Sequence, residues 1–282
     1  MLERFVVIGA GTMGAGIAYV AAGAGYVVDL VELDAERGRA ALAGLHALWD
    51  KAVARGKLDA AQAASAKDRL TLRGSLREVS PEPDVLVEAV PEKLELKRQV
   101  LEAAAALRPR LLASNTSSIA IGSLAANLPE PASFLGLHFF NPVFAMPLLE
   151  IVVGDQTSDE ARAHALDVAG RLGKDPVVVR DMPGFATSRL GVMLGLEAIR
   201  MLEDGVASAA DIDKAMKLGY KHPMGPLELT DVVGLDVRLD IARTLQAAYG
   251  DRFAPPELLV KMVAEGRLGK KTGEGFHTWP AS

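Results

Sequence analysis

Three glycines near the N-terminus separate an apolar run from a helical pattern. Residues 5–9 read Phe-Val-Val-Ile-Gly, and the segment Gly9-Ala-Gly11-Thr-Met-Gly14 opens an alanine-rich stretch with helical periodicity to about residue 22. A second β-branched run, residues 26–33, carries an acid at Glu32, about twenty residues beyond the glycines, as the dinucleotide fingerprint requires. Strand, glycine turn, helix and strand in this order predict a βαβ unit that binds a dinucleotide.

Each glycine has its own expected task. Gly9 permits the tight turn, Gly11 lets the backbone approach a pyrophosphate, and Gly14 lets the helix pack against the strand. Glu32 can accept both ribose hydroxyls and would repel a 2′-phosphate, which favours NAD over NADP. We therefore assign to NAD binding Gly9, Gly11, Thr12, Met13, Gly14 and Glu32. The alternative is a glycine turn that serves packing alone.

The remaining chain predicts two domains. Strands are expected at 85–90, 111–114, 134–140, 148–153 and 177–179, and helices at 34–54, 93–107 and from 158. Valine- and leucine-rich strands without alternation favour a parallel sheet covered on both faces. Residues 188–267 show helical periodicity and no convincing strand. We expect an α/β Rossmann-type NAD-binding domain at 1–183 and an all-helical domain at 184–282, to which the resemblance described below assigns substrate binding and dimerisation.

Composition excludes several functions. The chain has no cysteine, which rules out disulfides and thiolate catalysis, and no spacing of histidines and acids suggests a metal site. A net charge of −5 without a dense Lys/Arg block argues against nucleic acid and anionic membranes. No apolar stretch approaches the roughly 20 residues of a membrane span, and no leader is expected before the first strand. We expect a cytoplasmic protein.

Polar residues at the ends of later predicted strands form the candidate catalytic group. Residues 114–118 read Ser-Asn-Thr-Ser-Ser, His138 and Asn141 follow in Leu137-His-Phe-Phe-Asn-Pro142, and Glu150 lies in the next strand. Ligands of open α/β sheets bind where parallel strands end. A lone histidine in an apolar strand is more often a core residue than a catalyst. The presence of Ser117, Asn141 and Glu150 at neighbouring strand ends favours acid–base chemistry at His138 instead. No such group of polar residues surrounds the other histidines in the sequence, and we expect these to be structural or solvent-exposed: His46, His164, His222 and His277.

These motifs resemble those of short-chain L-3-hydroxyacyl-CoA dehydrogenases, the group that includes 3-hydroxybutyryl-CoA dehydrogenases. The resemblance covers nearly the whole chain. Besides the glycine loop it includes Val87-Glu-Ala-Val-Pro-Glu92, Ser114-Asn-Thr-Ser-Ser118, Gly136-Leu-His-Phe-Phe-Asn-Pro142, Met182-Pro-Gly-Phe185, Ala215-Met-Lys-Leu-Gly219, Pro223-Met-Gly-Pro226 and Gly269-Lys-Lys-Thr-Gly-Glu-Gly-Phe276.

The resemblance implies reversible, NAD-dependent oxidation of a short-chain (S)-3-hydroxyacyl-CoA, a reaction of fatty acid β-oxidation. It implies that His138 is the general base, that Glu150 holds the imidazole, and that Ser117 hydrogen-bonds the substrate oxygen. It also places Asn141 beside the nicotinamide and reacting centre. Further positions that match cofactor contacts of the family are Glu92, Lys97 and Lys271.

One position departs from the family pattern, in which asparagine stands where this chain has Ser188. Ser188 is a candidate substrate contact that could admit a water or a bulkier acyl group, or it is a plain helix N-cap. Lys51 and Arg55, four residues apart and on one helix face, are candidate CoA contacts, with a solvated helix face as the alternative.

We expect the chain to bind a CoA thioester as its substrate and to form a homodimer with a second copy of itself. The resemblance implies pairing through the helical domain, and residues 223–235 have the apolar character for it. Two other functions remain open: a dehydrogenase of a free 3-hydroxy acid or related small alcohol, and a non-catalytic NAD-binding protein.

Overall fold

Eight strands form one sheet in the computed structural model, which describes residues 3–280. The spatial order is β3-β2-β1-β4-β5-β6-β7-β8. The strands are β1 (Arg4–Ile8), β2 (Val27–Val31), β3 (Leu70–Arg73), β4 (Val85–Glu88), β5 (Leu111–Ser114), β6 (Phe134–Phe139), β7 (Leu148–Val153) and β8 (Asp175–Arg180). Strand β3 was not expected from the sequence.

The sheet is not wholly parallel, which corrects the sequence expectation. Every neighbouring pair runs parallel except β6 and β7, which are antiparallel. Only residues 140–147 connect these two strands. A parallel crossover needs about a dozen residues or more, usually with a helix, so the chain must turn back on itself here.

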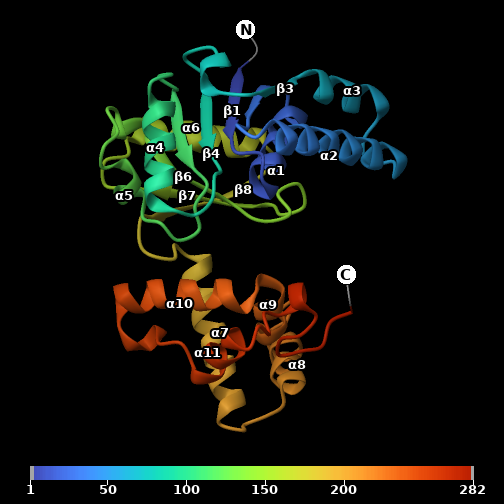
Figure 1. Cartoon of the computed structure of the whole chain (residues 1–282), viewed down its shortest axis with the longest axis vertical. Helices are drawn as coiled ribbons and strands as arrows, with labels where there is room; N and C mark the ends of the chain where they lie inside the picture. Colours follow the sequence, from blue (N-terminus) through green and yellow to red (C-terminus); the bar gives the residue numbers. More distant parts are fainter. Residues whose placement is uncertain (1–2, 281–282) are drawn as a thin grey trace. The chain divides into compact units, whose positions relative to one another are not determined.

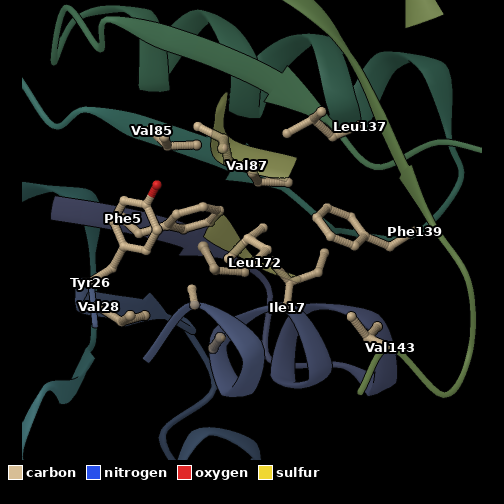
Figure 2. Packing of buried hydrophobic residues seen from close by; sticks show 14 of the residues in the cluster. Phe5, Ile17, Tyr26, Val28, Val85, Val87, Leu137, Phe139, Val143 and Leu172 are labelled. Atoms are coloured by element: carbon tan, nitrogen blue, oxygen red, sulfur yellow. The ribbon is translucent and has the colours of Figure 1, made fainter. Parts of the chain in front are cut away.

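The helices of this part of the chain lie on both faces of the sheet (Figure 1). They are α1 (Thr12–Gly23), α2 (Ala35–Ala54), α3 (Ala60–Asp68), α4 (Leu94–Ala105), α5 (Ile121–Ala125) and α6 (Asp159–Arg171). The main core packs α1, α2, α3 and α6 against one face, and Figure 2 shows Ile17 of α1 near Val87 and Phe139.

Strand alternation separates this core from the polar residues. Leu137, Phe139, Leu149 and Ile151 belong to the core cluster, so their neighbours His138 and Glu150 project from the opposite face. That is the face packed by α4 and α5. The candidate catalytic pair therefore lies on the sheet face that does not carry the main core.

The chain divides into two units after Asp181, two residues before the expected boundary. The second unit has its own core and, among the described residues, contains helices but no named strand. Its longer elements are α7 (Thr187–Glu203), α8 (Ala209–Gly219), α9 (Pro226–Val233), α10 (Leu235–Tyr249) and α11 (Glu257–Ala264). The expected α/β Rossmann-type unit followed by a helical unit is confirmed. None of the described helices is long and apolar enough to cross a membrane.

The glycine turn makes a stability prediction. A Cβ on Gly14 would lie 1.8 Å from the Gly9 carbonyl oxygen, whereas a Cβ on Gly23, in the same helix, would meet nothing within 4 Å. We expect Gly14→Ala to lower the unfolding free energy by about 2 kcal/mol or more, because backbone must move. Gly23→Ala should be neutral or stabilising by up to about 1 kcal/mol. Denaturant unfolding of both variants tests this, and equal effects would contradict it.

Candidate active site

The glycine loop has the geometry of a dinucleotide-binding turn. Gly9 adopts φ 99°, which favours glycine, and a Cβ there would lie 2.9 Å from the Ala89 carbonyl oxygen. A Cβ on Gly11, in contrast, would meet nothing within 4 Å, so the loop is open to a ligand at this position. Helix α1 begins at Thr12 and presents its N-terminal N–H groups and positive dipole end beside the loop.

The loop borders a cleft of about 1140 Å³ within the first unit. Among its lining residues are Gly9, Gly11, Thr12, Met13 and Glu32, the residues assigned to the cofactor from the sequence. The Glu32 carboxylate accepts the backbone N–H of Ala10 and of Asp34, both at 3.1 Å, which holds it at the cleft. These residues fit a dinucleotide: an open loop for the pyrophosphate and an acid for the ribose.

Sequence reasoning missed two basic residues of this cleft. Arg37 and Arg77 line it together with Glu32. Arg37 lies in the first turn of α2, whose N-cap Asp34 accepts its backbone N–H at 3.0 Å. Arg37 could have been predicted from the sequence. It follows Glu32 by five residues and lies in the first turn of the helix that starts directly after β2, so it stays at the same end of the sheet as Glu32.

A buried ion pair lies at the end of β4. Lys97 of α4 is fully buried and donates to both Glu88 carboxylate oxygens, at 2.8 and 3.1 Å, and to the Asn115 carbonyl at 3.1 Å. Burial raises the pKa of Glu88 above its ordinary value, against the opposing effect of the Lys97 charge. Ser114 donates to the same carboxylate at 2.7 Å. Glu88 was not identified from the sequence, since an acid at a strand end has no motif of its own.

Glu92 organises the loop after β5. Its Oε1 accepts the Thr116 hydroxyl at 2.6 Å and the backbone N–H groups of Ser117 and Ser118 at 3.0 and 3.1 Å. Burial acts to raise the pKa of Glu92, but the Lys97 charge and these donors outweigh it and hold the pKa below its ordinary value. Glu92 is therefore a carboxylate, and its bonds place Ser117 on a fixed loop.

The expected cofactor contacts at Glu92 and Lys97 remain predictions. The Glu92 side chain is 34% exposed and lies 3.4 Å from the Lys97 ammonium, which is itself inaccessible. The observed task of Lys97 is to hold two acids and a loop carbonyl in place.

His138 and Glu150 lie directly opposite each other. In the antiparallel pairing of β6 with β7, His138 is the register partner of Glu150. The imidazole Nδ1 and Glu150 Oε2 are 2.7 Å apart, in a site where the histidine is 7% exposed and the acid is fully buried. The ring also packs on Phe140, with centroids 4.4 Å apart. Packing and the acid together set the orientation of the imidazole.

The serine loop and the histidine strand are joined by Asn115. Its side-chain oxygen accepts the Phe139 backbone N–H at 3.0 Å. Asn115 thus connects the loop that carries Ser117 to the strand that carries His138, and was not singled out from the sequence. Asn141 is exposed, directly after β6, so it stands at the same strand end.

Two expected site residues belong to the second unit. Ser188 is the second residue of α7, and the N-cap is Ala186, so the N-cap alternative for Ser188 is wrong. The Lys271 ammonium is 2.6 Å from both Asp236 carboxylate oxygens. The roles expected for Ser188 toward the substrate and for Lys271 toward the cofactor remain predictions.

Lys51 and Arg55 are both exposed at the C-terminal end of α2. Among the described residues neither has an ion pair, and their role toward CoA stays a prediction.

His277 is held in a structural pair whose acidic partner the sequence did not predict. Its Nε2 lies 2.7 Å from Asp213 Oδ2. Asp213 also accepts the first N–H groups of α9, from Leu227 and Glu228, so this pair fastens the C-terminal segment to a helix start. Within 3–280, no group of three or more histidines and acids could hold a metal ion.

Comparison with known proteins identifies the family. The NAD-binding domain of 3-hydroxyacyl-CoA dehydrogenase matches residues 4–182, and the C-terminal domain of the same family matches residues 184–279. A 3-hydroxybutyryl-CoA dehydrogenase of Bradyrhizobium diazoefficiens is 39% identical, over 99% of this chain and 96% of its own. A 3-hydroxyadipyl-CoA dehydrogenase of Escherichia coli is also 39% identical, over 99% of this chain and 60% of its own.

The fold agrees with this assignment. The crystal structure of (S)-3-hydroxybutyryl-CoA dehydrogenase PaaH1 from Ralstonia eutropha superposes with a TM-score of 0.95 at 36% identity and covers all of both chains. The glycine loop and the cleft fit NAD. Together with the sequence matches, this shows that the chain belongs to the 3-hydroxyacyl-CoA dehydrogenase family and is an NAD-dependent oxidoreductase acting on a CH–OH group.

Proposed function

We propose that His138 is the general base in the oxidation of a short-chain (S)-3-hydroxyacyl-CoA to the 3-oxoacyl-CoA. The observation that carries this proposal is the 2.7 Å contact between His138 Nδ1 and Glu150 Oε2 on adjacent strands. With its Nδ1 proton directed at a buried carboxylate, the imidazole can accept a proton at Nε2. The loop residues Ser117 and Asn141 lie at the strand ends where ligands of such sheets bind.

The reaction releases a hydride and a proton. Bound NAD supplies the acceptor for the hydride that leaves C3. His138 takes the proton of the 3-hydroxyl, and Glu150 stabilises the imidazolium that results. Because the protonated histidine can return its proton to a 3-oxo group, the same residues serve the reverse reaction.

The serine loop supplies a hydrogen-bond donor for the substrate oxygen. Glu92 binds the backbone N–H of Ser117, so the serine hydroxyl is not needed to hold the loop. Among the described residues this hydroxyl has no hydrogen-bond partner, which suits a donor reserved for the substrate. Asn141 provides an amide near the same centre, and Glu92, held by Lys97, provides a carboxylate toward the cofactor.

The remaining assignments complete the binding of both ligands. Lys51 and Arg55 contribute positive charge for the phosphates of CoA, Ser188 faces the acyl group, and Lys271 contacts the cofactor. The cytoplasmic location expected from the sequence stays a prediction.

We also propose a homodimer formed through the helical unit. Leu229, Val232 and Val233 of α9 are spaced for one helix face and are 37, 42 and 41% exposed. Val237, at the start of α10, is 42% exposed. An apolar stripe of this kind is stabilised when a second copy covers it.

The substrate class is tested by competition. We expect oxidation of 3-hydroxybutyryl-CoA with NAD to exceed oxidation of free 3-hydroxybutyrate by 10²-fold or more in kcat/KM, because the binding energy of CoA positions the thioester. NADH formation is measured at 340 nm, the usual absorbance band, at about neutral pH. Equal kcat/KM for the free acid would overturn the CoA assignment, and no turnover of either would favour a non-catalytic protein.

The catalytic assignment is tested by two histidine variants. We expect His138→Ala to lower kcat by about 10²–10⁴-fold while NADH still binds, because only the proton acceptor is lost. His277→Ala is the matched control, since it removes the other histidine that is paired with a carboxylate. Its kcat per folded protein should stay near the parent value. Near-normal turnover by His138→Ala would exclude the proposed role.

The dimer is tested by light scattering at micromolar concentration. We expect the parent chain to have twice the monomer mass and Val232→Glu to shift it toward the monomer, because a charge would be buried in the interface. Val206→Glu is the control, as Val206 is 62% exposed and lies outside the α9 stripe. A monomeric parent chain would contradict the proposal.

A further inference from the structure

An arginine of the helical unit is buried without a partner. Arg238 of α10 is 5% exposed, and its Nε is buried with no hydrogen-bond partner. No ion pair or side-chain hydrogen bond joins this guanidinium to any residue of the described chain, 3–280. Burial alone lowers the pKa of Arg238 to about 10, which still leaves the group charged near neutral pH.

The acids near Arg238 in sequence lie elsewhere. Asp240, two residues further along α10, is exposed. Asp236 is bound by the Lys271 ammonium at 2.6 Å. Asp231 accepts the backbone N–H of Phe276 and of His277, both at 2.8 Å, and the Trp279 indole N–H at 2.9 Å. Among the described residues, none of these three carboxylates pairs with the buried cation. A buried unpaired charge costs several kcal/mol, so it is rarely retained without a counter-ion.

The space around the guanidinium comes from two glycines of α7. A Cβ on Gly195 would lie 3.6 Å from both Nε and Cζ of Arg238, and a Cβ on Gly191 would lie 3.8 Å from its terminal Nη1. The guanidinium thus runs along α7 from Gly195 toward Gly191, which is toward the N-terminal end of the helix.

Ser188 lies on the same face of that helix. Positions 188, 191 and 195 are separated by three and four residues, the spacing of one helical face. The charged end of Arg238 is therefore directed toward the turn that carries the proposed acyl contact. The positive dipole end of α7 lies at that turn as well and favours an anion there.

We propose that Arg238 binds a carboxylate at the far end of the acyl group, so that the preferred substrates are 3-hydroxyacyl-CoA thioesters of dicarboxylic acids. This inference rests on the proposed function and names its substrate class. A guanidinium forms paired hydrogen bonds with a carboxylate, and a terminal methyl would leave the buried cation unpaired.

The test compares two substrates of equal length. 3-Hydroxyadipyl-CoA ends in a carboxylate where 3-hydroxyhexanoyl-CoA ends in a methyl. We expect the full-length enzyme to prefer 3-hydroxyadipyl-CoA by about 10- to 100-fold in kcat/KM, the range of a charge-assisted hydrogen-bonded pair. In Arg238→Met this ratio should fall to about one or below, mainly through KM for the adipyl substrate.

The ratio does not depend on the amount of folded enzyme, because both substrates are measured on one preparation. Arg238→Lys keeps the charge and should retain part of the preference, while Arg243→Met, at an exposed arginine of the same helix, should leave the ratio unchanged.

A parent enzyme that favours 3-hydroxyhexanoyl-CoA, or an Arg238→Met variant with an unaltered ratio, would overturn the inference. An unaltered ratio together with loss of the dimer would instead assign Arg238 to the subunit interface. Failure to oxidise either of these substrates or 3-hydroxybutyryl-CoA would overturn the proposed function, and the two failures are therefore distinguishable.

Discussion

The site depends on one reversal of strand direction. Strands β1 to β6 run parallel, and β7 and β8 could continue in the same direction only if the chain crossed over between β6 and β7. Residues 140–147 are too few for such a crossover. The resulting antiparallel pair sets His138 directly across from Glu150. Side chains in such register lie about 5 Å apart at Cβ, close enough for an imidazole and a carboxylate to bond. Twelve residues of separation in sequence thus become a direct contact.

The polar side chains of the site lie on one face of the sheet, among buried apolar residues of the same face such as Leu86 and Leu112. The face against α1 and α6 carries an apolar core, while the polar side chains at 88, 114, 138 and 150 project from the other face. There the buried Lys97–Glu88 pair, Ser114 and the bonds of Glu92 join the ends of β4 and β5 to the loop that follows β5. Asn115 adds a bond from that loop to β6. Such a network restricts the loop conformation, which suits a site that must hold a substrate oxygen and a base in fixed relation.

The helical unit shows a different arrangement of charge. Asp213 and Asp231 collect backbone N–H groups and tie the C-terminal segment to α9, and each is fully engaged. Arg238 is the contrast, a buried cation beside glycines instead of acids. The two glycines at 191 and 195 remove side chains where the guanidinium lies, and the geometry of this group is what carries the inference about the acyl end of the substrate.

Local signals were sufficient for the dinucleotide fold and the order of most elements, while the resemblance to a family singled out His138, Glu150 and Ser117, whose roles stay predictions. The glycine turn, the periodicity and the helix caps each depend on residues a few positions apart, so they can be recognised without the structure. The antiparallel β6–β7 pair, edge strand β3, the buried Glu88–Lys97 pair, the Asp213 partner of His277 and the isolation of Arg238 were decided only by tertiary structure. Each depends on which distant segment packs alongside, and burial and pairing are properties of that packing, which no local pattern encodes.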